Sequence, residues 1–250
     1  MKNINRNQGF TFLELMITIL IMVIISAVAI PSLNGFFADM KLNIAGEGIA
    51  TAIWYAQNLA VKEEKMHQVI FSTVANGNDL MVQREEGGIW STVLNPFNKK
   101  DYIVDFDTDR DVKGVNITDA DFGGTTSVIF GSDIEDPGRP SDCGDVIIEY
   151  GGNKRVITVG HITGKVMAGD LIETGSVISD TGNSTTQFKT NLTKTTNGYF
   201  NGYTIIITSN NDCYIREIAD YDGTNRIITV DYDYPLSTPR GGDGFEIVGF

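Results

Sequence analysis

The chain has 250 residues, 42% of them hydrophobic and 20% charged, with 32 acidic residues against 19 basic ones. This length and composition suit one or two domains with a buried core, and they exclude a wholly disordered or collagen-like chain. The formal net charge of −13 argues against sequence-independent nucleic-acid binding, because phosphate neutralisation needs lysine and arginine.

The most apolar part of the chain runs from Phe10 to Ile30 and contains a single charged side chain, Glu14. As a helix it would be roughly 31 Å long, which matches the hydrocarbon core of a bilayer. Lys2 and Arg6 precede it, and positive flanks stay in the cytoplasm. We therefore expect a single span at residues 10–30, with the remaining chain outside the cytoplasm.

A secretory signal peptide and a plain signal anchor are the alternatives for this segment. The run is longer than the core of a signal peptide, and no small-residue cleavage site follows it. Glu14 speaks against a plain anchor, because an ionisable group within a span is costly and usually has a partner.

The residues from Gly9 to Leu15, GFTFLEL, follow a short basic leader and begin the apolar run. This pattern resembles the prepilin signal of type IV pilin-like proteins. The resemblance implies that prepilin peptidase cuts between Gly9 and Phe10 and that the new N-terminal amine of Phe10 is methylated. It also implies that Glu14 pairs with the amine of a neighbouring subunit, and that Pro31 stands where the family has a helix-bending proline.

After Pro31, apolar residues recur at steps of three and four, which predicts that the helix continues to about Lys65 with one face against a sheet. The chain from His67 onward alternates short apolar runs with Gly-rich turns. The predicted strands are 68–73, 79–84, 89–93, 102–106, 115–117, 127–130, 146–150 and 155–159, ending at 165–166. One long helix followed by an antiparallel sheet is an α+β arrangement.

A narrower resemblance is carried by Ala56–Lys62 with Val69–Phe71, and by the closing segments Val128–Gly131, Gly144–Ile148 and Arg155–Val159 with Gly164–Val166. These resemble GspH/FimT-type minor pseudopilins of type II secretion. Gln57 stands where that family commonly has arginine, so the ion pair of that arginine is not expected here.

Residues 168–250 extend beyond the usual end of such proteins, and we interpret them as a second, small all-β module. The predicted strands there are 171–178, 204–208, 213–218, 226–230 and 245–248, and Asp222-Gly223 predicts a hairpin turn. Six tyrosines gather in this module, for which sheet packing is favoured over a binding face. The predicted division is therefore a leader (1–9), a transmembrane and filament helix (10–30), a pseudopilin-like α+β domain (31–167) and this module.

The sequence offers little support for catalysis. It has two histidines, His67 and His161, and no nucleophile motif, so we expect no enzyme activity, cofactor or metal. Asp105, Asp107 and Asp109 alternate as at the start of a calcium loop. The sixth position of that loop holds Arg110 instead of glycine, and the twelfth holds Asn116 instead of glutamate, so a hydrated acidic loop is favoured over a calcium site.

A second acidic loop, for which the same interpretation is favoured, is predicted at Asp133, Glu135, Asp136, Asp142 and Asp145. Cys143 and Cys213 are the two cysteines. An oxidising compartment would permit a disulfide between them, but spacing alone leaves paired and free thiols open.

These patterns favour a minor pseudopilin that prepilin peptidase processes and that assembles with other pilin or pseudopilin subunits into a type II secretion pseudopilus. Its expected partners are the inner-membrane assembly platform, the membrane itself and a secreted substrate, with no nucleic acid. The expected location is the inner (plasma) membrane, with a periplasmic globular part that enters the filament. The alternatives are a minor type IV pilin for adhesion or DNA uptake, and a membrane-anchored polysaccharide-binding protein.

Overall fold

The computed structural model describes residues 11–131, 138, 140–160, 164–209, 212–231 and 238–249, without the side chains of 28–34, 209 and 212. The chain divides into two compact units, Met1–Met40 and Lys41–Phe250. In its described part, the first unit is helical from Phe12 onward, and all the strands given below belong to the second unit.

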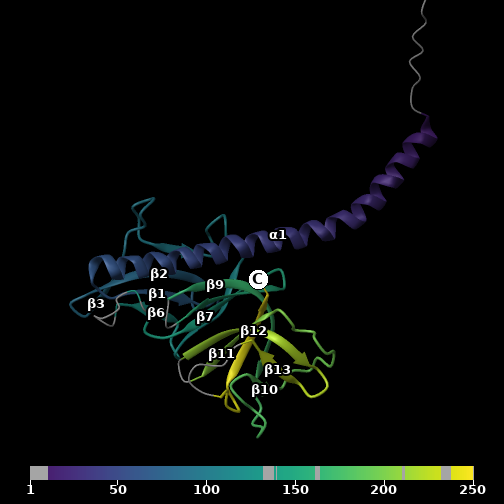
Figure 1. Ribbon diagram of the computed structural model, residues 1–250. Coiled ribbons are helices and arrows are strands. Elements are labelled where there is room, and N and C mark those ends of the chain that lie inside the picture. The colour runs from purple at the N-terminus through teal and green to yellow at the C-terminus, as the bar shows by residue number, and fades with distance from the viewer. Residues whose placement is uncertain are drawn as a thin grey trace, which may run out of the picture. The chain divides into compact units, whose positions relative to one another are not determined.

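Helix α1 extends from Phe12 to Glu63 and continues without interruption across Pro31 (Figure 1). It ends where Glu64 takes a left-handed backbone conformation with φ of 52°. From Lys41 onward one face of α1 is apolar and packs into the main core, while Trp54 on the opposite face is 62% exposed. The buried positions are Leu42, Ala45, Ile49, Ala52, Ile53, Ala56 and Ala60, as the three- and four-residue periodicity predicts.

The first sheet is antiparallel and follows directly after the helix. Its strands are β1 (His67–Ser72), β2 (Asp79–Glu86), β3 (Ile89–Thr92), β4 (Ile103–Asp105) and β6 (Ser127–Phe130). Strand β1 lies between β2 and β6, and β2 pairs along its other edge with both β3 and β4.

The second sheet has nine strands in the order β10-β13-β12-β11-β14-β9-β8-β7-β5. Its strands are β5 (Asn116–Phe122), β7 (Gly144–Tyr150), β8 (Asn153–Val159), β9 (Val166–Ser176), β10 (Gln187–Lys189), β11 (Thr204–Ser209), β12 (Asp212–Asp222), β13 (Ile227–Val230) and β14 (Gly244–Gly249). All neighbouring pairs are antiparallel.

Strand β9 connects two layers of this sheet. Residues 166–170 pair with β8, whereas residues 170–176 pair with β14, and the register shifts between Ile247 and Val248 of β14. A strand that changes partners at an irregularity is a common way to turn a corner between layers. The first layer is therefore β5-β7-β8-β9, and the second is β9-β14-β11-β12-β13-β10.

Three apolar clusters fill the spaces on either side of these layers. The largest lies between α1, the first sheet and one face of β7–β8. A small one, with Val156, Ile206 and Val248 at its centre, lies between the two layers. The third, around Tyr221 and Phe200, covers the outer face of the second layer. Alternation along β7 and β14 sends successive side chains to different clusters.

The predicted α+β class, with a long helix followed by antiparallel sheets and further β structure, is confirmed. The hairpin at Asp222-Gly223 is also present, between β12 and β13. The strands predicted separately at 165–166 and 171–178 were wrong, because one continuous strand, β9 (Val166–Ser176), runs from the first range into the second. Strand β10 was not predicted. The predicted division at residue 167 remains a prediction.

The structure pairs Cys143 with Cys213 in a disulfide, with 5.7 Å between the Cα atoms. Cys143 directly precedes β7 in the first layer, and Cys213 lies in β12 of the second. The bond therefore links the two layers beside the small cluster between them.

Candidate functional site

The predicted processing site at Gly9 and Phe10 lies outside the described residues. The structure begins next to it, at Thr11, where the amide nitrogen lies 3.5 Å from Glu14 Oε2 and the Glu14 amide donates to Thr11 Oγ1 at 3.2 Å. This reciprocal pair is a capping box, which satisfies two amides that the first helical turn leaves free. The Glu14 carboxylate is thus held beside Thr11, the residue directly after Phe10.

The side chains of residues 11–27 are all exposed, including Phe12, Met22 and Ile25. A continuous apolar surface of this size on a helix marks a site of contact with lipid or protein. Within the described residues, no helix has an apolar stretch that meets the length and hydropathy of a membrane span. The predicted span at 10–30 is thus not found among the residues that the structure describes.

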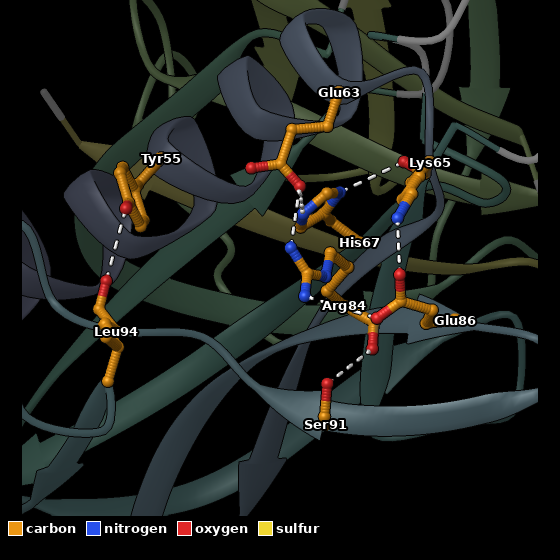
Figure 2. Close-up of polar contacts among 8 residues, drawn as sticks. All are labelled: Tyr55, Glu63, Lys65, His67, Arg84, Glu86, Ser91 and Leu94. Atoms are coloured by element: carbon orange, nitrogen blue, oxygen red, sulfur yellow. Dashed lines mark hydrogen bonds and ion pairs between the residues drawn. The ribbon is translucent and has the colours of Figure 1, made fainter.

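A cluster of ion-paired side chains joins the C-terminal end of α1 to the first sheet (Figure 2). Arg84 of β2 is central: its Nη1 lies 3.3 Å from Glu63 Oε2, and its Nη2 lies 3.4 Å from Glu86 Oε2. Lys65 Nζ reaches Glu86 Oε1 at 2.8 Å. These pairs are partly exposed, so they orient the helix end more than they stabilise it.

His67 lies at the base of this cluster and is fully buried. Its Nδ1 lies 3.0 Å from the Lys65 carbonyl oxygen and therefore carries a proton, while its Nε2 lies 3.5 Å from Glu63 Oε2. Burial lowers the pKa of His67 below its usual value, whereas the Lys65 carbonyl and the Glu63 charge act in the opposite direction. His67 is therefore a packing residue at the join between α1 and β1.

The environment of His67 predicts a measurable titration. Its NMR-detected pKa should lie below 6.5, and Glu63→Gln should lower it further by removing the carboxylate that favours the imidazolium. Because the folded-state pKa is depressed, the corresponding stability is present above about pH 6.5 and is lost as the pH falls. Glu64→Gln, at an exposed neighbouring position, is the matched control and should leave the pKa unchanged. A pKa above 6.5 in the parent protein would contradict this account.

A second polar contact between the helix and a sheet lies near the start of the buried part of α1. Arg155 of β8 donates to the side-chain oxygen of Asn43 on the helix and to Asp170 Oδ1 at 2.9 Å and 3.1 Å. A Cβ at Gly46 would lie 3.2 Å from Arg155 Cδ, so the glycine gives the arginine stem room to cross the helix. The helix is uninterrupted at Gly46, where the glycine serves close packing.

Gln57 takes part in a third contact between helix and loop. Its Nε2 donates to the Gly138 carbonyl at 2.8 Å, and Gly164, with φ of 60°, lies directly against its amide. This neutral hydrogen bond stands where the resembled family has an ion pair.

Gly131, with φ of 83°, approaches the Lys65 carbonyl so closely that a Cβ would lie 2.8 Å from that oxygen.

Sequence reasoning missed the buried Asn78, which joins its own turn to the connection between β4 and β5 and to the start of β5. Its Nδ2 donates to Asp107 Oδ1 at 2.8 Å and to the Val115 carbonyl at 3.0 Å, and its Oδ1 accepts from the Ile117 amide at 2.8 Å. Its backbone has φ of 53°, a conformation that asparagine tolerates better than most residues. The signal available in the sequence was the Asn76-Gly77-Asn78 turn, which does not reveal these partners.

The three candidate calcium ligands are engaged in local contacts or near a backbone amide. Asp105 accepts hydrogen bonds from Thr108 and from the Asp107 amide, and these lower the pKa of its carboxyl group. Asp107 accepts from Asn78, and the Asp109 carboxylate lies 3.4 Å from the Asp111 amide nitrogen. Among the described residues, no group of three or more potential ligands is placed to hold a metal ion.

The other candidate residues fall in several places. Asp145 was assigned to a second acidic loop, but it lies within strand β7, because the alternation of Val146 and Ile148 drives that segment into the core. Asp133, Glu135, Asp136 and His161 lie outside the described residues.

Of the tyrosines, Tyr221 is buried and donates to the Lys194 carbonyl at 2.6 Å, whereas Tyr199 is 46% exposed. Tyr203 and Tyr214 pack against the outer cluster, and Tyr232 and Tyr234 are not described.

Comparison with known families bears on the N-terminal segment. A model described as the prokaryotic N-terminal methylation motif matches residues 4–30. The chain carries a prepilin-type signal. Such a signal implies processing by prepilin peptidase, a membrane-anchored N-terminus and assembly with other pilin subunits, so the N-terminal part is type IV pilin-like. No curated protein matches the chain. The match ends at residue 30, and the closer resemblance to GspH/FimT-type pseudopilins remains a prediction.

Proposed function

We propose that the chain is a minor, non-enzymatic structural subunit of a type II secretion pseudopilus. The observation that carries this proposal is the methylation motif at residues 4–30, joined to a helix that continues from it into a folded β-rich unit. Cleavage before Phe10 would begin the mature chain one residue before the capping box. Glu14 would then lie in the first turn, where its carboxylate is available to a neighbouring subunit's N-terminal amine.

The two parts of α1 suit different tasks in such a subunit. Its exposed apolar part would pack against lipid before assembly and against other subunits afterwards, in the inner membrane with the N-terminus cytoplasmic. Its second part holds the extracytoplasmic unit through the apolar stripe and the contacts of Arg84, Arg155 and Gln57. The second unit would thus move with the part of the helix that it packs against when the filament extends toward a secreted substrate.

A parallel assay in the native host tests the choice of machine. Deleting the gene should lower the amount of secreted protein in the medium while surface pili remain, and the full-length gene supplied in trans should restore secretion. Loss of pili with normal secretion would instead assign the subunit to a type IV pilus. Normal pili and normal secretion would contradict the proposal and favour a membrane-anchored binding protein.

A further inference from the structure

Two acidic side chains meet in the space between the two layers of the second sheet. Asp145 lies in β7 of the first layer and Glu246 lies in β14 of the second, with β8 and β9 between them in strand order. Asp145 lies on the same face of β7 as Ile147, and Glu246 lies on the same face of β14 as Val248, so both side chains face the cluster between the layers. There the two carboxyl groups share a hydrogen bond. They can do so only because β9 turns the corner, which places the inner faces of the layers opposite one another.

Among the residues that the structure describes, no basic side chain acts on the charge of this pair. Asp145 is opposite Asp121 on β5 and Thr158 on β8, while Glu246 is opposite Ile206 on β11 and Thr174 on β9. The charged groups that act on the pair are both acidic, Asp119 and Asp121. The buried Oε2 atom of Glu246 receives no hydrogen bond from a donor among the described residues.

Two carboxyl groups in contact, without a donor for a buried oxygen, can satisfy each other only if one holds a proton. We infer that Asp145 and Glu246 share a proton and act as a pH-sensitive clasp that closes the two layers of the sheet when protonated and opens them when ionised. This inference concerns the second unit alone and is independent of the proposed filament function.

The pKa values of both carboxyl groups are shifted upward, the direction that a shared proton requires. Burial, the contact with Asp145 and the charge of Asp119 raise the pKa of Glu246 to about 9, and burial also raises that of Asp145. A carboxyl whose folded-state pKa is raised contributes most stability at low pH. That stability is lost as the pH rises from the unfolded value of 4.5 toward about 9. The clasp therefore weakens across the neutral and alkaline range.

The Cys143–Cys213 disulfide limits how far the layers separate. Cys143 precedes Asp145 by two positions, and Cys213 lies in β12 at the opposite layer. Because the disulfide holds the β7–β12 side and β9 joins the layers at the corner, opening should be largest in the strands of the second layer that lie between them, β14 and β11.

The test uses the full-length protein in detergent and its Glu246→Gln variant. Between pH 5 and 9 the parent should lose thermal stability, and hydrogen exchange of β14 amides, corrected for intrinsic rates, should rise about tenfold. The variant keeps a side-chain hydrogen bond without the ionisation, so its stability and exchange should change far less. Glu217→Gln, at an exposed position of β12, is the matched control and should behave as the parent does.

A spectroscopic measurement keeps the inference testable if a variant folds poorly. The infrared spectrum at pH 7 should contain a protonated carboxyl band that Glu246→Gln removes or shifts, and that Asp145→Asn also alters. An identical spectrum in parent and variant, or equal pH dependence of parent and Glu246→Gln, would overturn the inference. Suppression of the alkaline opening by added calcium would also overturn it, because the pair would then be a cation site.

Discussion

Replacing Glu14 with glutamine is expected to lower incorporation of the chain into filaments by roughly tenfold or more, while cleavage of the leader continues. An unpaired charge within a membrane span costs about 2.5–3.5 kcal/mol, and the variant would leave a neighbour's N-terminal amine without its partner. The measurement compares the amount of mature protein in sheared filaments with the amount in whole cells.

The capping box makes this substitution informative. Glutamine can serve at the third position of a capping box, so Glu14→Gln preserves the contact with Thr11 but removes the charge. Glu14→Ala removes both. If the charge acts between subunits, both variants should assemble poorly. Normal assembly of Glu14→Gln together with a defect in Glu14→Ala would show that Glu14 acts only as a helix cap, contrary to the role proposed here.

Asn78→Ala is expected to destabilise the second unit by on the order of 3–5 kcal/mol, the largest effect that we predict for a single substitution there. It would leave the Ile117 amide, the Val115 carbonyl and Asp107 without their side-chain partner, and each such loss costs about 1–3 kcal/mol when buried. Alanine is also less suited than asparagine to the left-handed backbone at this position. Chemical unfolding followed by circular dichroism measures the change.

Asn76→Ala is the matched control, two residues away in the same turn. Its side chain is exposed and makes one long contact, 3.4 Å to Thr73 Oγ1, so its loss should change stability by less than about 0.5 kcal/mol. Equal effects of the two substitutions would mean that the Asn78 hydrogen bonds contribute no more than an ordinary surface contact, which would refute the account of this residue.

The helix and most strands could be predicted because their signals are local. The predicted helix from Phe10 to about Lys65 differs little from the observed Phe12–Glu63, since the stripe from Leu42 to Ala60 repeats at helical spacing. The prepilin motif is likewise contiguous, and the match to residues 4–30 supports it.

The features that escaped prediction depend on residues far apart in the sequence. Strand β9 changes partners midway, and nothing in its own residues shows that its second half will pair with β14. The meeting of Asp145 with Glu246 depends on that corner, so Asp145 was assigned to a solvated loop. Whether Cys143 and Cys213 pair or stay free also depends on how the two layers lie, because the cysteines belong to different layers.

The central claim is that the chain is a processed, pilin-like subunit, and intact mass spectrometry tests it most directly. Protein isolated from cells that express prepilin peptidase should lack residues 1–9 and carry one methyl group on the amine of Phe10. Gly9→Val, made as the control, should retain the full-length mass because the side chain obstructs the cleft of the protease. Parent protein that keeps its leader in the presence of active peptidase, or that is cut elsewhere, would contradict the claim.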